Sequence, residues 1–407
     1  MKRSLIATTL LSLFAVSSVN AAQETTSETA ELRKIIAEQD KILKDLERRL
    51  DETDQRVEAT ADAVDSASTS SNATTIGGYG ELHYNNISDN NDSADDKKEI
   101  DFHRFVLFFG KEFNSTTRFF SEFELEHALS GDDKAGEVEL EQAYIEHDIN
   151  DQLTTQFGVF LVPVGLMNET HEPPTFYGVE RNPVEKNILP TTWWEAGANL
   201  NYKPTAGWSI DTAFHSGLDI SEKGSYKPRD GRSKVSEAAA DAFAFTGRVS
   251  YTAIPGLQLA ASVQYQEDIT QGGLVNVGGV ETAVDEASAT LLTAHAVYQI
   301  NKFTVKALYA TWDIDGNEAE VLGRDEQSGY YIEPSYKLND EFGVFARYNM
   351  WDNEAGNSDD TEIEQVNFGI NYYLHENVVI KADYEIQDGK DDAIDKDGFN
   401  LGMGYQF

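Results

Sequence analysis

The chain of 407 residues has no cysteine and no apolar run near the ~20 residues that a membrane-spanning helix needs. Without cysteine there is no disulfide, so folding does not depend on the oxidising machinery of the cell envelope. The second absence excludes a helical membrane protein. It does not exclude a transmembrane barrel, because each barrel strand is only ~10 residues long and is apolar on one face. A mean hydropathy of −0.46 fits both a soluble protein and a transmembrane barrel. The pattern of residues along the chain must therefore distinguish these two classes.

Basic residues are also scarce. The chain has 32 Lys and Arg against 71 Asp and Glu, which gives a net charge of −39 at pH 7. A nucleic-acid backbone selects a basic surface, so this composition argues against nucleic acid as a partner. The charge alone does not reveal a solute preference, and its position along the chain matters more.

The N-terminus has the order of a secretory signal peptide. Lys2 and Arg3 precede an apolar stretch from Leu5 to Val16, and Val19-Asn20-Ala21 is a cleavage site of the A-x-A kind. The apolar stretch is too short for a transmembrane anchor. We therefore expect residues 1–21 to be removed on export from the cytoplasm.

A seven-residue repeat follows the signal peptide. Two sets of residues, the second displaced by four from the first, form the seam of a coiled coil. We expect residues 22–74 to be a periplasmic α-helical coiled coil that ends in a Ser/Thr/Asn linker. A single amphipathic helix lying on the rest of the protein is the alternative. The two sets are Leu32, Gln39, Leu46, Thr53 and Thr60, and Ile36, Leu43, Leu50, Val57 and Val64.

From Thr75 the repeat changes from seven residues to two, and it continues to the last residue. A strand between lipid and an aqueous lumen needs such alternation. The terminal Phe407 resembles the signal by which the barrel assembly machinery recognises outer-membrane proteins, so we expect that machinery to be a partner. The last strand shows the pattern most clearly, with polar residues or glycine between Phe399, Leu401, Met403, Tyr405 and Phe407.

Runs with this period predict about sixteen strands between residues 75 and 407. Tight turns such as Asn114-Ser115 alternate with long acidic loops. Short turns on one rim and long loops on the other are typical of an outer-membrane barrel. The predicted fold class is all-β, a transmembrane antiparallel β-barrel whose loops face outer-membrane lipids and lipopolysaccharide. The expected long loops are 88–99, 129–137, 163–190, 218–241, 269–287, 313–327, 352–361 and 388–397.

If the apolar phase of each strand faces lipid, the other phase lines a polar lumen that holds water. Basic and acidic side chains are nearly balanced in that phase, so most of the negative charge lies elsewhere. We expect no cofactor and no metal site, because acidic runs such as Asp313-Ile314-Asp315-Gly316 miss the spacing of a calcium-binding EF-hand. The main inward charges are Arg104, Arg118, Glu122, Glu124, Glu126, Arg248, Lys306, Arg347 and Lys381.

Several short motifs resemble the phosphate-selective porin O and P family. The resemblance covers the whole barrel, is densest before residue 200, and implies a homotrimer in which each barrel has its own pore. Phosphate selectivity in that family comes from arginines and lysines along the pore. This chain keeps Arg104 but has His103 where a second arginine is expected. The motifs are Ile76-Gly77-Gly78-Tyr79-Gly80-Glu81, Asp101-Phe102-His103-Arg104, Leu140-Glu141-Gln142-Ala143-Tyr144-Ile145-Glu146, Gly158-Val159-Phe160-Leu161-Val162-Pro163-Val164-Gly165 and Val179-Glu180-Arg181.

In porins of sixteen strands, the loop after strand 5 folds into the pore and narrows it. The corresponding segment here, 163–190, is stiffened by four prolines between residues 163 and 183. An ordered cap on the outer rim is the alternative. The expected constriction residues are Glu169, His171, Glu172, Glu180, Arg181, Glu185 and Lys186.

These patterns predict passive diffusion of small hydrophilic solutes or ions, including anions such as phosphate, through the outer membrane. A second hypothesis is an envelope tether, in which the coiled coil contacts the periplasm or cell wall and the barrel serves as its anchor. A barrel enzyme is the third, and it lacks a motif in which a base orients a nucleophile. We therefore expect no catalytic residues, although histidines occur at His127, His147, His171, His215 and His295.

Overall fold

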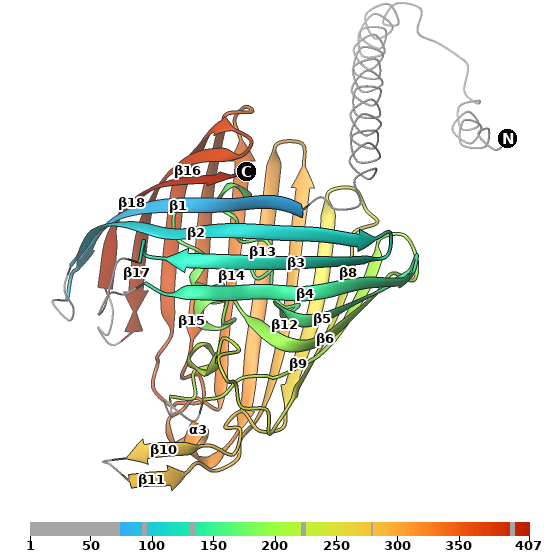
Figure 1. The fold of residues 1–407 in the computed structure, drawn as a ribbon. Helices are drawn as coiled ribbons and strands as arrows, with labels where there is room; N and C mark the ends of the chain where they lie inside the picture. Colours follow the sequence, from blue (N-terminus) through green and yellow to red (C-terminus); the bar gives the residue numbers. More distant parts are fainter. Residues whose placement is uncertain (1–73, 92–95, 130–135, 221–224, 278–279, 391–394) are drawn as a thin grey trace, which may run out of the picture. The chain divides into compact units, whose positions relative to one another are not determined.

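Sixteen strands close into an antiparallel barrel (Figure 1). The computed structural model describes residues 74–91, 96–129, 136–220, 225–277, 280–390 and 395–407, and the strand count refers to these ranges. The barrel strands are β1 (Thr74–Asp89), β2 (Lys97–Asn114), β3 (Thr117–Glu126), β4 (Val138–Asn150), β5 (Leu153–Leu161), β6 (Trp194–Tyr202), β7 (Trp208–His215), β8 (Ala244–Tyr251), β9 (Leu257–Gln266), β12 (Ser288–Ile300), β13 (Phe303–Asp315), β14 (Glu326–Lys337), β15 (Phe342–Asp352), β16 (Ile363–His375), β17 (Val378–Gly389) and β18 (Asp395–Gln406).

The strands expose apolar side chains on the outside and bury polar ones inside, the reverse of a soluble protein. In β9, Leu259, Val263 and Tyr265 are 40%, 39% and 47% exposed, whereas Ser262 and Gln264 between them are buried. Successive side chains of a strand point to opposite faces, so the two-residue repeat of the sequence produces this inversion directly. Lipid outside and a wet lumen inside require it. The predicted all-β antiparallel barrel is confirmed.

The barrel closes where its first and last strands meet. The Gly78 N–H donates to the Phe407 carbonyl at 3.0 Å, and the Phe407 N–H donates back to Gly78 at 2.9 Å. A Cβ at position 78 would lie 2.2 Å from the Val106 carbonyl oxygen of β2. Glycine therefore allows β2 to approach β1 closely beside the point of closure.

The two rims differ as the sequence predicted. Tight turns, such as residues 115–116 and 376–377, join strands at one rim, and long segments such as 216–243 join them at the other. The expectation that segment 269–287 is irregular was wrong in part. A separate hairpin lies there, in which β10 (Leu274–Val277) pairs with β11 (Val280–Ala283). Strands of four residues are too short to show a clear two-residue period.

Residues 1–73 lie outside the described ranges, so the signal peptide and the coiled coil stay predictions. Among the residues that the structure describes, no helix is both long and apolar enough to cross a membrane. The short helical segments are η1 (Pro173–Thr175), α2 (Pro183–Asn187), η2 (Pro228–Gly231) and α3 (Asn317–Val321).

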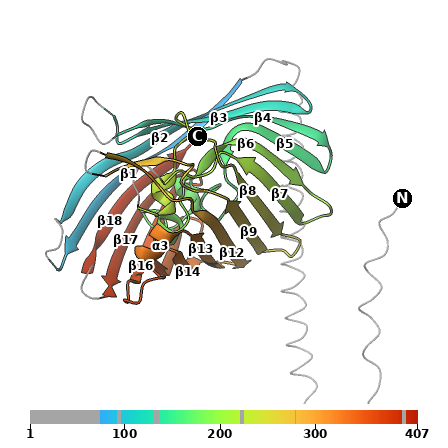
Figure 2. The same ribbon diagram turned by 90° about the horizontal axis from the view of Figure 1, so that it is seen from below.

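Part of the lumen is filled by the chain itself. Loop 3, defined here as residues 162–193 between β5 and β6, lies inside the ring of strands (Figure 2). Its Val164 and Ile188 belong to a buried apolar cluster with inward residues of β12 and β13, among them Leu291 and Trp312. The expectation of a polar lumen face on every strand is therefore wrong for this part of the wall. Loop 3 takes the place of water there, so an apolar face is favoured.

Candidate functional site

Loop 3 crosses the lumen and is bonded to the opposite wall. The Val179 N–H donates to Asp383 Oδ2 on β17 at 2.6 Å, and Lys381 Nζ on the same strand donates to the Gly178 carbonyl at 2.8 Å. Arg347 on β15 also donates to a carbonyl of the loop. Several bonds from two strands hold the tip of the loop within the barrel and away from its outer rim.

Glu185, one of the predicted constriction residues, is buried and holds loop 3 in shape. Its Oε2 accepts hydrogen bonds from the backbone N–H groups of Leu166 at 2.8 Å and Met167 at 2.7 Å. Its Oε1 accepts from the Tyr331 hydroxyl on β14 at 2.8 Å. Burial raises the pKa of Glu185, and the hydrogen bonds oppose that rise. These contacts give the side chain a structural role.

Two other predicted residues tie loop 3 to the wall of the barrel. The buried His171 has its Nε2 3.4 Å from Glu122 Oε1 on β3, and Glu169 forms an ion pair with Arg248 on β8. Glu172 is half-buried and lies just before η1. His171 and Glu169, both predicted at the constriction, thus help to attach loop 3 to the barrel wall.

Glu180 connects the tip of loop 3 to β1. Its Oε1 lies 3.2 Å from His83 Nδ1 and accepts a hydrogen bond from Asn85 Nδ2 at 2.9 Å. Burial alone would raise the pKa of Glu180, but the hydrogen bonds and the charge of His83 lower it well below its usual range. Glu180 is therefore a fixed negative charge at neutral pH.

Loop 3 lies between two cavities. A cavity of about 720 Å³ on the long-loop side, called the vestibule below, is lined by loop 3, by the segment 216–243 and by several strands, including β1 and β2. A second cavity of about 540 Å³ on the short-turn side is lined by Thr175 and Tyr177 of loop 3 together with Lys302, Lys306 and Lys337. The tip of the loop separates the two.

Three basic side chains of the vestibule donate hydrogen bonds to neutral groups. Arg181 Nη1 donates to Thr192 Oγ1 at 2.8 Å, and Arg229 Nη1 donates to the Thr191 carbonyl at 2.6 Å. Arg232 donates to the Thr192 carbonyl. Lys186 also lines the vestibule. Within the described ranges, none of the four has a carboxylate partner within salt-bridge distance, and Arg181 Nε and Nη2 are buried without a hydrogen-bond partner.

The pKa values of Arg229 and Lys186 show the effect of crowded positive charge. Burial, followed by the charge of Arg232, lowers the pKa of Arg229. Burial, followed by the charge of Arg229, lowers the pKa of Lys186. Like charges in a partly desolvated space disfavour one another. An anion that entered the vestibule would relieve this repulsion.

The charges predicted on the strands point into the barrel and are mostly paired. Arg104 Nε is 2.7 Å from Glu81 Oε1, and Arg347 Nη1 is 3.1 Å from Glu333 Oε2. The remaining contacts join Arg118 to Glu146 and Asp148, Arg248 to Asp211, and Lys306 to the Thr175 carbonyl, while Glu122 and Glu124 are buried and Glu126 lines the vestibule.

Arg229 and Arg232 were not predicted from the sequence, because candidates were sought only in the inward phase of the strands and in segment 163–190. A local signal was present. The run Lys227-Pro228-Arg229-Asp230-Gly231-Arg232-Ser233-Lys234 has four basic residues and one acidic residue in a chain of opposite composition. Sequence alone could not place this run beside loop 3, since long loops have no period that fixes their direction.

Comparison with known proteins agrees with the barrel fold. The family model for phosphate-selective porin O and P matches residues 75–407. An uncharacterized protein of Aquifex aeolicus (strain VF5) is 33% identical over 362 residues, which are 82% of this chain and 80% of the relative.

Two solved structures share the barrel fold at low identity. An anion-selective porin from Comamonas acidovorans is 12% identical, with a TM-score of 0.57 over 83% of this chain and all of the other. The trimer form of OmpT, an outer-membrane protein of Vibrio cholerae, is 13% identical, with a TM-score of 0.54 over 82% of this chain and all of the other.

Proposed function

Because the chain belongs to the phosphate-selective porin O and P family, it is an outer-membrane channel, and we propose that this channel passes small hydrophilic anions by passive diffusion. The cluster of Arg181, Lys186, Arg229 and Arg232 carries the proposal. Four cations without a carboxylate partner in the described chain create a positive potential where the passage is enclosed by protein. A low-dielectric wall strengthens that potential and raises the local concentration of anions.

The proposed path runs from the vestibule past loop 3 to the second cavity. Loop 3 forms the constriction, with Arg181 and Lys186 on its vestibule side. Lys302, Lys306 and Lys337 line the cavity beyond it. An anion therefore meets basic side chains on both sides of the narrow segment, although the whole chain carries a net charge of −39.

The direct test is the reversal potential of purified channels in planar bilayers across a KCl gradient. We expect the sign of an anion-selective pore. In the double variant Arg229→Gln/Arg232→Gln, the permeability ratio of chloride to potassium should fall by at least about twofold. Lys390→Gln is the matched control, because Lys390 is an exposed lysine already paired with Glu362. A cation-selective wild-type channel would refute the anion preference.

A second arm of the same experiment addresses phosphate. We expect added phosphate to reduce the chloride current of the wild type through competition in the vestibule, and to have less effect on the double variant. An equal effect of phosphate on both proteins would exclude the arginine cluster as the binding position.

We further infer that the protein is exported by its N-terminal segment 1–21 and forms a trimer whose residues 22–74 associate as a coiled coil in the periplasm. The heptad seam of that segment supports this assembly, and the OmpT structure with the same fold is described as a trimer form. Contact of the coiled coil with the cell wall would add a tethering role to the channel.

A further inference from the structure

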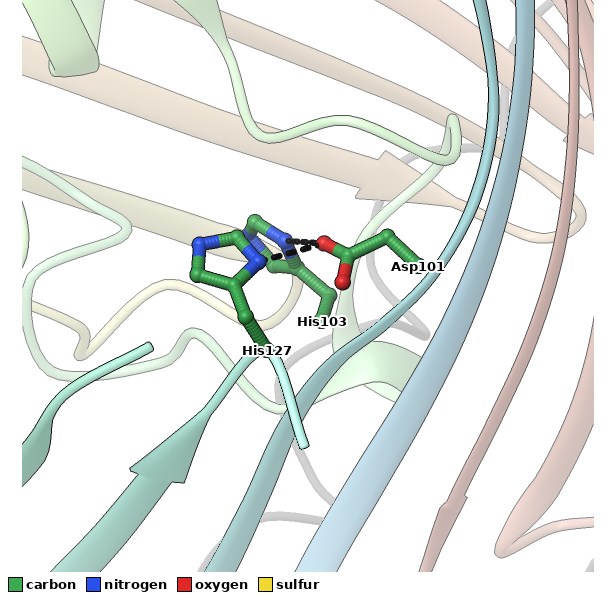
Figure 3. Close-up of side chains that lie close together, drawn as sticks. All are labelled: Asp101, His103 and His127. Carbon is green, nitrogen blue, oxygen red and sulfur yellow. Dashed lines mark hydrogen bonds and ion pairs between the residues drawn. The ribbon is translucent and has the colours of Figure 1, made fainter. Parts of the chain in front are cut away.

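We infer that Asp101, His103 and His127 form a binding site for a divalent transition-metal ion of the zinc class in the vestibule wall (Figure 3). Their candidate ligand atoms lie within 4.8 Å of one another. Two imidazoles and a carboxylate are the donor set that zinc uses when it keeps a coordination position open for water or another ligand.

The backbone brings these side chains together through an irregularity in β2. Glu81 pairs with Arg104 and His83 pairs with Asp101, so two residues of β2 lie opposite Leu82 alone. This bulge interrupts the alternation and allows His103 and Arg104, adjacent in sequence, both to line the vestibule. His103 therefore joins Asp101 on the inner side of the wall.

The third ligand comes from the end of β3. Glu126 pairs with Arg104, which places the next residue, His127, opposite His103. The His127 N–H donates to the His103 carbonyl at 3.1 Å, and this bond fixes the position of His127 relative to β2. All three proposed ligands thus belong to paired strands or are bonded to them, which gives the preorganised support that a metal site needs.

The donor atoms already converge on one point. His103 Nδ1 lies 3.0 Å from Asp101 Oδ2, and His127 Nδ1 lies 2.7 Å from the same oxygen. Tetrahedral zinc with bonds of about 2.0–2.1 Å holds its ligands about 3.3 Å apart. The carboxylate would therefore move outward by less than about 1 Å to admit the ion. Coordination through Nδ1 needs the neutral ring with its proton on Nε2, so each neutral histidine exchanges its Nδ1 proton for one on Nε2 through solvent, and only a doubly protonated ring releases a proton.

The neighbours of the site orient one ligand and leave the cluster open. The His103 ring stacks on His83 at a centroid distance of 4.6 Å, and His83 is held by Glu81 and Glu180. The side chains of Asp101, His103 and His127 are 19%, 25% and 32% exposed. An ion can therefore reach the cluster from the vestibule without displacing the wall.

The nitrogen ligands determine the class of ion. Imidazole suits zinc, copper and nickel, whereas magnesium and calcium prefer sites made only of oxygen ligands. The other compact group of suitable residues in the described chain, Glu122, Glu141 and His171, is fully buried. Its histidine belongs to loop 3 and holds that loop to β3, so that group is a poorer candidate for a solvent-exchangeable ion.

The test uses the full-length, untagged protein in detergent after dialysis against a chelator. We expect isothermal titration with ZnCl₂ to give one site per chain, and Co²⁺ to produce the visible absorption bands of an ion bound by imidazole nitrogen. His127→Gln and Asp101→Asn should each weaken Zn²⁺ binding by more than about tenfold. His375→Gln, which changes an exposed histidine at the opposite rim, is the matched control and should bind as the wild type does.

Folding of each variant is checked by its heat-dependent shift in gel mobility. Two separate ligand variants are used, so that the test still stands if one of them fails to fold. Wild-type binding weaker than millimolar, or unchanged Zn²⁺ affinity in a folded His127→Gln variant, would overturn the proposal. Neither readout requires ion flow, so failure of the metal site and failure of the proposed anion channel are distinguishable.

Discussion

Single polar side chains determine where loop 3 lies. Asp383 and Lys381 bond to its tip, and Glu185 bonds to the two backbone N–H groups near its start. A buried polar group that loses its partner costs about 1–3 kcal/mol. A few side chains therefore hold loop 3, and removal of any one of them should destabilise its position. These side chains are not the four basic residues, Arg181, Lys186, Arg229 and Arg232, that face the vestibule.

Glu185→Ala should loosen the constriction. The N–H groups of Leu166 and Met167 and the Tyr331 hydroxyl would lose their acceptor, at a cost of about 1–3 kcal/mol for each buried group left unpaired. We expect a higher and noisier single-channel conductance. Glu172→Ala is the control, because Glu172 is half-buried and precedes η1. A quiet channel with wild-type conductance in Glu185→Ala would contradict this role.

Lys186 should make the anion preference sensitive to alkaline pH. Burial and Arg229 lower its pKa from the usual 10.5, so its charge is lost as pH rises through a value below that of an ordinary lysine. Anion preference should therefore decline before pH 10.5, and the decline should be smaller in Lys186→Gln. Between the folded and unfolded pKa values the unfolded chain binds more protons, so this group makes stability rise with pH in that window. Reversal potentials measured from pH 7 to pH 10.5 in the wild type and in Lys186→Gln test the expected decline in anion preference.

At the scale of elements, the positions of the strands could be predicted from the sequence. The character of the side chains on their inner surface could be predicted only in part. A two-residue repeat and tight turns are local signals, and they located all sixteen barrel strands. Leu291 and Trp312 face inward against loop 3, which no local pattern reports. The bulge that directs His103 inward was hidden as well, because strict alternation places His103 and Arg104 on opposite faces. Contacts that depend on a distant segment need the whole fold.

The pairing of β1 with β2, beside the point where the barrel closes, should be sensitive to a single methyl group. In Gly78→Ala, the new Cβ would lie 2.2 Å from the Val106 carbonyl oxygen, so the strands must separate. We expect overpacking of about 1–3 kcal/mol and a lower temperature for the gel-mobility shift of the folded barrel. Gly247→Ala in β8 is the matched control, since its Cβ would meet its nearest atoms at an ordinary 3.7 Å. Equal unfolding temperatures for the two variants would show that the β1–β2 pairing tolerates the added group.

At the scale of the molecule, the apolar outside and polar inside of the barrel account for a chain that is strongly charged yet resides in lipid. Ion pairs neutralise the inward arginines of the strands, as in Arg104 with Glu81 and Arg347 with Glu333, and the arginines without a carboxylate partner in the described chain come from loops. Net charge of the sequence and charge along the path are therefore different quantities. Under the proposed function, the path favours anions although the composition of the chain is acidic.

If the protein is a trimer with a pore in each barrel, its conductance should fall in three equal steps when voltage closes the channels. Removal of residues 22–74 should weaken the trimer while each remaining barrel still conducts, because the barrel residues hold loop 3 by themselves. Native mass spectrometry in detergent gives the subunit number independently. A single closing step from a monomeric mass would contradict the assembly.

The attachment of loop 3 also sets an order of events during biogenesis. The Val179 N–H finds its acceptor on a residue 204 positions later in the chain, so this contact has a high contact order and forms late. The chain must deliver β17 to the membrane before the loop has its final partners. Any species that lacks β17 also lacks the contact that fixes the tip of loop 3, so the narrow passage depends on the completed barrel.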